Sequence, residues 1–186
     1  MSNPAINPTK VITGKCRLSY AHIWEPSSIN ENSPAKYSAC IIIPKTDKAT
    51  LAKLQTATEA AIQDGIKSKW KGKRPPKLKL PLRDGDEERP DDDAFAGCYF
   101  INANSSRQPG VVDLARQPIL DRDEIYSGCY CRFAVNLYPF STNGNNGVAV
   151  GLNNVQKVAE GERLAGGSRA EDDFNDGYTG DLDDIL

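Results

Sequence analysis

The segment SGCYCRFAVNLYPF, residues 127–140, alternates cleanly between apolar and polar side chains. This period of two residues is typical of a β-strand that buries one face and exposes the other. The following residues, STNGNNG, contain Asn-Gly turn chemistry. The segment VAVGLNNVQKV then predicts the partner strand of a hairpin. We expect the core side of the first strand to be formed by Cys129, Cys131, Phe133, Val135 and Leu137, and the outer side by Tyr130, Arg132, Asn136 and Tyr138.

Three further strands are predicted upstream, in VITGKCRLSYAHIW, KYSACIIIPK and AFAGCYFINANSS. In the first of these, alternation places Ile12, Cys16, Leu18 and Tyr20 on one face, and Lys15, Arg17 and Ser19 on the other. Between the second and third strands the period changes to that of a helix, from Asp47 to Trp70, with Thr46 or Asp47 as the N-cap. Pro75 and Pro76 cannot continue this helix.

These elements predict a mainly β domain. A five-stranded antiparallel Greek-key barrel of the OB type, with one long inserted helix, fits the number of strands. A two-layer α+β sheet is the alternative that the pattern leaves open. We place the domain in residues 1–164 and a flexible hinge with a disordered, acidic C-terminal tail in residues 165–186.

The charged residues are unevenly distributed along the chain. Residues 171–186 hold seven acids and no base, and residues 84–93 hold seven acids and one base. The rest of the chain holds 22 bases and 11 acids, a net charge of +11. A basic body with segregated acidic segments indicates a polyanionic partner, whereas the alternative is that lysine and arginine only keep the domain soluble.

The five cysteines include no C-x-x-C pair, and the chain has a single histidine. This composition favours reduced, buried thiols over a disulfide framework or a zinc site. The N-terminus has no apolar segment typical of a signal peptide, and no apolar run is long enough to span a membrane. We therefore expect a cytoplasmic protein without a metal or another cofactor and without membrane association.

Two kinds of side chain are candidates for binding a nucleic acid. Aromatic rings stack on bases of any identity, and basic groups neutralise phosphates. The aromatic candidates are Trp24, Tyr37, Tyr99, Tyr130 and Tyr138. The basic candidates are Lys15, Arg17, Lys36, Lys77, Lys79, Arg107 and Arg132. The alternative interpretation is an ordinary solvated strand face, with aromatic rings packed beneath loops.

The acidic block Asp84–Asp93 offers many oxygen ligands for a hard cation, but it lacks the spacing of a calcium-binding loop. A nuclease site would need carboxylates that converge from different elements. We expect this block to be a solvated, flexible loop that repels nucleic acid from one face of the domain. No motif of a nucleotide-binding phosphate loop is present.

Three ordered blocks carry a resemblance to a known family: GCYFINANSSRQPGVVD, EIYSGCYCRFAVNLYPF and NGNNGVAVGLNNVQKVAEGERLAGG. They resemble the bacteriophage single-stranded-DNA-binding proteins, a family long catalogued as a domain of unknown function. The resemblance runs from about Asn7 to Phe174. It implies an OB-type fold, sequence-independent binding of single strands and a role in phage replication or recombination. It carries no catalytic residues over to this chain.

The last residues, DLDDIL, are similar in character to the acidic tips with which single-strand-binding proteins dock on replication partners. We expect the tail to compete with DNA for the basic groove and to bind phage or host replication or recombination proteins. The candidate partner-binding residues are Asp172, Asp173, Phe174, Asp181, Asp183, Asp184, Ile185 and Leu186. A tail that only improves solubility is the alternative.

The leading hypothesis is therefore a non-enzymatic protein that binds single-stranded DNA, with RNA as a further possible ligand. Two alternatives belong to other classes: a metal-dependent nuclease or resolvase that uses the Asp84–Asp93 block, and a virion or scaffold protein whose tail docks on another shell component.

Overall fold

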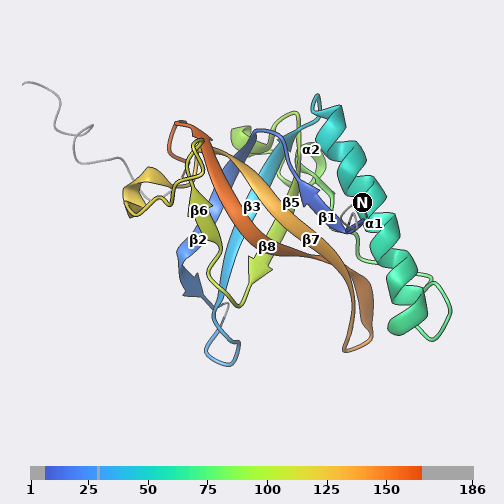
Figure 1. Ribbon diagram of the computed structural model, residues 1–186. Helices are drawn as coiled ribbons and strands as arrows, with labels where there is room; N and C mark the ends of the chain where they lie inside the picture. The colour runs from blue at the N-terminus through green and yellow to red at the C-terminus, as the bar shows by residue number, and fades with distance from the viewer. Residues whose placement is uncertain (1–6, 29, 165–186) are drawn as a thin grey trace, which may run out of the picture.

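The computed structural model describes residues 7–28 and 30–164. They form a mainly β domain with an eight-stranded sheet and two α-helices (Figure 1). The strands are β1 (Lys10–Ile12), β2 (Cys16–Ser27), β3 (Lys36–Pro44), β4 (Arg83–Asp84), β5 (Cys98–Ser105), β6 (Gly110–Val112), β7 (Tyr130–Thr142) and β8 (Asn145–Ala159). The helices are α1 (Lys48–Ser68) and α2 (Gly85–Glu88), with short 3₁₀ turns η1 (Asp93–Phe95) and η2 (Arg122–Glu124). No helix in the described part of the chain is long and apolar enough to cross a membrane.

Five of the strands close into a ring. β2 pairs with β3, β3 with β5, β5 with β8, β8 with β7, and β7 returns to β2. The strands β1 and β6 extend the sheet beyond the ring by pairing with β7 and β8. The pairings of β5 and β6 with β8 are parallel, and the other pairings of these strands are antiparallel, so the sheet is mainly antiparallel as predicted.

The predicted hairpin forms the longest pair of strands, β7 and β8. The apolar side of β7 is buried as the alternation indicates, and Cys131, Phe133 and Val135 are fully enclosed. Asn143 and Gly144 connect the two strands, both with positive φ, which suits the tight turn that asparagine and glycine favour. The inward residues of β8, Val148, Val150 and Leu152, complete this part of the core.

The helix α1 lies beside the ring and buries one side against β7 and β1 (Figure 1). Asp47 is its N-cap, and its side chain accepts a hydrogen bond from the backbone N–H of Thr50 at 3.1 Å. Its apolar residues recur at helical spacing and join the main core, among them Leu51, Leu54 and Ile62. The predicted helix and its N-cap are therefore present.

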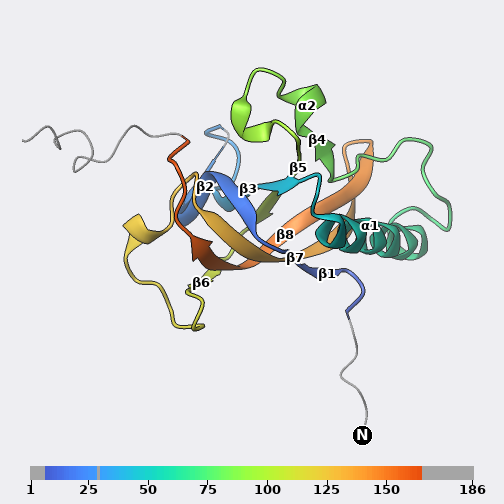
Figure 2. The same ribbon diagram turned by 90° about the horizontal axis from the view of Figure 1, so that it is seen from above.

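A second, smaller core lies on the outer face of β3 and β5. Phe95 and Phe100 meet edge to face, with ring centroids 5.1 Å apart, and they pack with Cys40 and Ile42. Phe95 belongs to the segment that contains α2 and η1, which stands over this side of the sheet (Figure 2). The prediction that the Asp84–Asp93 block is a flexible loop is thus wrong, because this adjoining phenylalanine anchors the block to the sheet.

Candidate nucleic-acid interface

Three of the predicted binding residues meet where β2 joins β7. The ammonium group of Lys15 lies 5.0 Å from the centroid of the Tyr130 ring, and the guanidinium carbon of Arg17 lies 5.6 Å from it. Register explains the contact, because Arg17 pairs directly with Tyr130. Arg17 also donates hydrogen bonds to the carbonyl oxygens of Gly128 at 3.1 Å and Glu162 at 2.7 Å. These two hydrogen bonds attach the Arg17 side chain to the backbone at Gly128 and Glu162, whereas the Lys15 side chain is exposed.

Arg132, the next outward residue of β7, has structural partners. Its Nε donates to the carbonyl oxygen of Thr13 at 3.1 Å, and its Nη1 donates to the Gln156 side chain at 3.4 Å. The hydroxyl of Thr13 in turn accepts the backbone N–H of Phe133 at 3.0 Å. Arg132 thereby ties the β1–β2 connection to β7, which reduces its freedom to follow a phosphate backbone.

A basic segment joins the tip of the β7–β8 hairpin. The backbone N–H of Lys79 donates to the carbonyl oxygen of Asn146, and the N–H of Val148 donates to the carbonyl oxygen of Lys79, both at 2.9 Å. A side chain at Gly147 would meet the Lys79 carbonyl oxygen at 2.3 Å, so glycine is needed for this approach. The side chains of Lys77 and Lys79 remain exposed. No local pattern predicts this contact, because the two segments are far apart along the chain.

Tyr138 lies on the outer side of the same hairpin and is 39% exposed. It pairs with Ala149, and Phe140 pairs with Gly147, so two aromatic residues stand opposite two small ones. Residues that pair directly across a strand project to the same side. The outer side of the hairpin therefore presents the Tyr138 ring, while the Lys79 backbone covers this side at Gly147.

Lys36 is the first residue of β3 and follows the loop that connects β2 to β3. It lines a pocket of about 310 Å³ together with residues of β2, β3 and β5 and the loop between β2 and β3: Ser27, Ser33, Pro34, Ser38 and Asn104. Lys36 is exposed, while Tyr37 is half-buried. The β2–β3 connection and the β7–β8 hairpin both project from the lower edge of the ring in Figure 1.

The other candidates occupy different settings. Trp24 packs partly against the main core, and its indole N–H donates to the Ile125 carbonyl oxygen at 3.4 Å. Tyr99 also packs against the main core, with the Lys45 ammonium group 5.0 Å from its ring centroid. Arg107 is exposed after β5. Trp24 and Tyr99 are thus less available to a ligand than Tyr138.

Lys45 holds the acidic block in place. Its ammonium group lies 2.9 Å from a carboxylate oxygen of Asp84 and 2.8 Å from one of Asp86. Hydrogen bonds from Lys45 lower the pKa of both carboxyl groups. Asp84 also caps α2, since its side chain accepts the backbone N–H of Asp86 at 2.9 Å. Several of the acids therefore have structural roles, and no group of three or more residues that could hold a metal ion exists in the described ranges.

A groove of about 690 Å³ separates the acidic block from the end of the described chain. Its basic residues are Arg17, Arg89 and Arg163, and its acidic residues are Glu88, Asp91, Asp92, Asp93 and Glu162. The segment that follows Leu164 carries the predicted hinge and the tail. The tail residues Asp172, Asp173, Phe174, Asp181, Asp183, Asp184, Ile185 and Leu186 lie outside the described residues.

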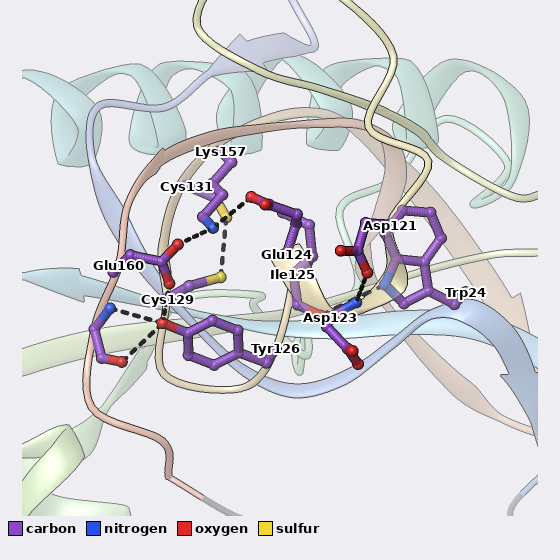
Figure 3. A network of polar contacts seen from close by, with 11 residues as sticks. Trp24, Asp121, Asp123, Glu124, Ile125, Tyr126, Cys129, Cys131, Lys157 and Glu160 are labelled. Carbon is purple, nitrogen blue, oxygen red and sulfur yellow. Dashed lines mark hydrogen bonds and ion pairs between the residues drawn. The ribbon is translucent and has the colours of Figure 1, made fainter. Parts of the chain in front are cut away.

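A polar network fixes the segment that precedes β7 (Figure 3). Lys157, which is largely buried, donates hydrogen bonds to Glu124 at 3.0 Å and to Glu160. Burial opposes the charge of Lys157, but the bonds to the two carboxylates outweigh it and raise its pKa. Tyr126 bonds to Glu160 and to the Gly161 carbonyl oxygen, and the chain immediately before Tyr130 is thereby held to β8. The network therefore holds the segment that leads to Tyr130, whose ring lies beside Lys15 and Arg17.

The closed five-stranded ring, with basic and aromatic groups at its edge, is typical of the OB folds. These are small β-barrel domains whose faces and loops bind oligonucleotides and oligosaccharides. The chain belongs to the family described as "Enterobacter phage Enc34, ssDNA-binding protein", whose model matches residues 9–186.

One curated protein and two solved structures illustrate what this chain is similar to. Putative protein p50 of Acyrthosiphon pisum secondary endosymbiont phage 1 is 28% identical over 188 residues, which cover 95% of this chain and 98% of that protein. The fold matches the single-stranded DNA-binding protein from bacteriophage Enc34 in complex with ssDNA, with a TM-score of 0.75 and 22% identity over 86% of this chain and 91% of the other. It also matches gp2.5, a single-stranded DNA binding protein encoded by bacteriophage T7, with a TM-score of 0.60 and 17% identity over 92% and 98% of the two chains.

Proposed function

We propose that this protein binds single-stranded DNA without sequence preference, as a non-enzymatic component of phage replication or recombination in the host cytoplasm. The family assignment supports this proposal. The arrangement of charged and aromatic groups around the ring supplies the physical basis.

The strand order of the ring corresponds to an OB-type barrel, in which β2, β3, β5, β7 and β8 are the five strands in chain order. OB folds bind oligonucleotides on the face of their second and third strands, between the first and fourth connecting loops. In this chain that face belongs to β3 and β5. Phe95 covers its half at Cys40, Ile42 and Phe100, and the half at Ser38 and Asn104 is partly exposed. The two loops are the β2–β3 connection and the β7–β8 hairpin.

The observation that carries the proposal is the presence of exposed lysine side chains at both of these loops. Lys36 stands at the first, and Lys77 and Lys79 stand at the second through the backbone bonds of Lys79 to the hairpin. A strand crossing the outer face would meet phosphate-binding groups at both ends. Tyr138 adds an exposed ring on which a base can stack.

The test is the binding of a labelled oligothymidine, followed by fluorescence anisotropy at several salt concentrations. Tight binding that weakens with salt is expected for the single strand, with much weaker binding to a duplex of the same length. An oligouridine of equal length shows whether the site also accepts RNA. Equal affinity for single strand and duplex, or no binding, would contradict the proposal.

For the tail we propose two linked roles: competition with DNA for the basic surface, and recruitment of phage or host replication or recombination proteins. The support is its charge, since residues 171–186 carry seven acids and no base. A tethered polyanion is present at high effective concentration next to its own domain. A chain that ends at Arg169 is expected to bind oligothymidine more tightly than the full chain at low salt. Unchanged affinity would leave docking or solubility as its role.

A further inference from the structure

Tyr20 does not lie where its position in the sequence predicts. Alternation along β2 assigns it to the same face as Cys16 and Leu18, which are fully buried, yet the Tyr20 side chain is 51% exposed. The register of β2 with β3 shifts between Ser19 and His22. The irregularity at this point takes the ring out of the core, and the prediction that Tyr20 faces inward is wrong.

The backbone at Tyr20 is unusual as well. Its φ angle is +45°, in the left-handed region that residues with a Cβ atom rarely adopt. Four non-glycine residues among those described have a positive φ, and the other three, Lys71, Arg116 and Asn143, lie in turns or bends. Of these four residues, Tyr20 is the one that lies inside a strand. Such strain persists where the surrounding structure over-determines it, and it is concentrated at functional sites.

The exposed ring has a basic neighbour from the acidic block. The guanidinium carbon of Arg89 lies 5.9 Å from the Tyr20 ring centroid, and 5.7 Å and 5.9 Å from the centroids of Phe95 and Phe100. Arg89 therefore stands at the border where the buried outer core ends and an exposed aromatic begins. Within residues 7–28 and 30–164 its guanidinium forms no ion pair with a carboxylate.

The location of Tyr20 matches the proposed path of the strand. Ser19 and His22, on either side of the irregularity, pair with Cys40 and Ser38 of β3, the strand whose outer face OB folds use. Ser38 also lines the pocket that contains Lys36. The acids beside Arg89 repel phosphates, so an uncharged nucleobase is the part of the strand that suits this position.

We propose that Tyr20, held out of the core by the irregularity in β2 and flanked by Arg89, is a base-stacking residue for single-stranded nucleic acid. The inference rests on the proposed function, because a stacking residue has meaning only if the protein binds single strands. Glycine would adopt the backbone conformation of residue 20 without strain. A role of the ring in ligand binding explains why a tyrosine is present there instead.

The test compares three variants with the unmodified protein in the oligothymidine assay. Tyr20→Phe keeps the aromatic ring and is expected to bind within twofold of the unmodified protein. Tyr20→Leu keeps an apolar side chain without a ring and is expected to bind roughly 5- to 150-fold more weakly, the range measured for the loss of one base–aromatic stack. The slope of affinity against salt should not change in either variant, because no phosphate contact is removed.

Two controls separate stacking from stability. Tyr20→Gly removes the ring and relieves the backbone strain, so we expect unchanged or higher thermal stability together with the same loss of affinity as Tyr20→Leu. Leu114→Ala shortens another exposed side chain, which is 64% exposed in the loop after β6, and should change neither property. An oligonucleotide with 5-iododeoxyuridine should also form a photocrosslink to the peptide that contains Tyr20.

The outcomes are distinguishable. If the unmodified protein binds oligothymidine and Tyr20→Leu and Tyr20→Gly bind within twofold of it, the stacking role is refuted while the proposed function stands. If the unmodified protein does not bind single strands, both fall together. A loss of affinity in Tyr20→Phe equal to that in Tyr20→Leu would also refute stacking, because the ring would then not be the group that matters.

Discussion

Replacing Lys77 and Lys79 by glutamine should weaken the salt dependence of single-strand binding by a calculable amount. Both side chains are exposed, and the hydrogen bonds of Lys79 to the β7–β8 hairpin come from its backbone N–H and carbonyl groups. Glutamine preserves those backbone bonds. The double variant therefore removes two positive charges from the proposed DNA path while leaving the hairpin contact intact.

The size of the change in salt dependence follows from the number of basic side chains that are available to phosphates. Five of the predicted basic residues are exposed and, in the described part of the chain, have side chains that form no ion pair and donate no hydrogen bond: Lys15, Lys36, Lys77, Lys79 and Arg107. Each phosphate contact with a single strand contributes about −0.7 to the slope of log K against log salt. Five contacts give a slope of about −3.5, and the double variant should show about −2.1. If the two lines meet at 1 M salt, the difference corresponds to about a 25-fold loss of affinity at 0.1 M.

Anisotropy of labelled oligothymidine over a range of salt concentrations measures both slopes. The matched control is Lys48→Gln with Lys53→Gln, which removes two exposed charges from the start of α1 and should leave the slope near −3.5. An unchanged slope in the Lys77 and Lys79 variant would show that the basic segment contacts no phosphate. An equal decrease in the control would show that net charge, rather than position, sets the effect.

Three further outcomes are expected. Phe95→Ala should lower the free energy of unfolding by about 3–5 kcal/mol, because it removes a fully buried ring from its contact with Phe100, and urea denaturation measures this loss. Because its folded-state pKa is raised, Lys157 should stabilise the fold at all pH values below about 10.4 and lose this effect as the pH rises above its folded-state pKa, so the decline in unfolding free energy at alkaline pH should be smaller in Lys157→Met. Iodoacetamide at pH 8 should modify Cys98 before Cys40, because Cys98 is partly exposed whereas burial raises the pKa of Cys40 to about 12, and peptide mass spectrometry shows the order.

Local patterns in the sequence are sufficient for much of the secondary structure. The alternation in residues 127–140 predicts both the position of β7 and the residues that it buries. The N-cap Asp47 and the helical spacing that follows it predict α1. These predictions succeed because side-chain alternation and helix capping depend on residues close to each other in the chain.

The position of the acidic block was decided by tertiary packing. Its composition predicts a solvated loop, and its carboxylates are largely exposed. The adjoining Phe95 nevertheless buries its ring against Phe100 on the outer face of the sheet, and Lys45 pairs with Asp84 and Asp86. The residues close to this segment in the sequence do not include its apolar partner. Burial against that partner offsets the conformational entropy lost when such a charged segment becomes ordered.

The candidate site divides in the same way. The residue types that a single strand needs, and the alternation that exposes Tyr138, are visible in local sequence patterns. In contrast, tertiary packing places Trp24 on the core, Lys79 beside the hairpin and Tyr20 outside the core at an irregularity in β2. Each of these depends on a partner strand or loop far away in the chain, and the register between distant segments is set by the packing of the whole ring.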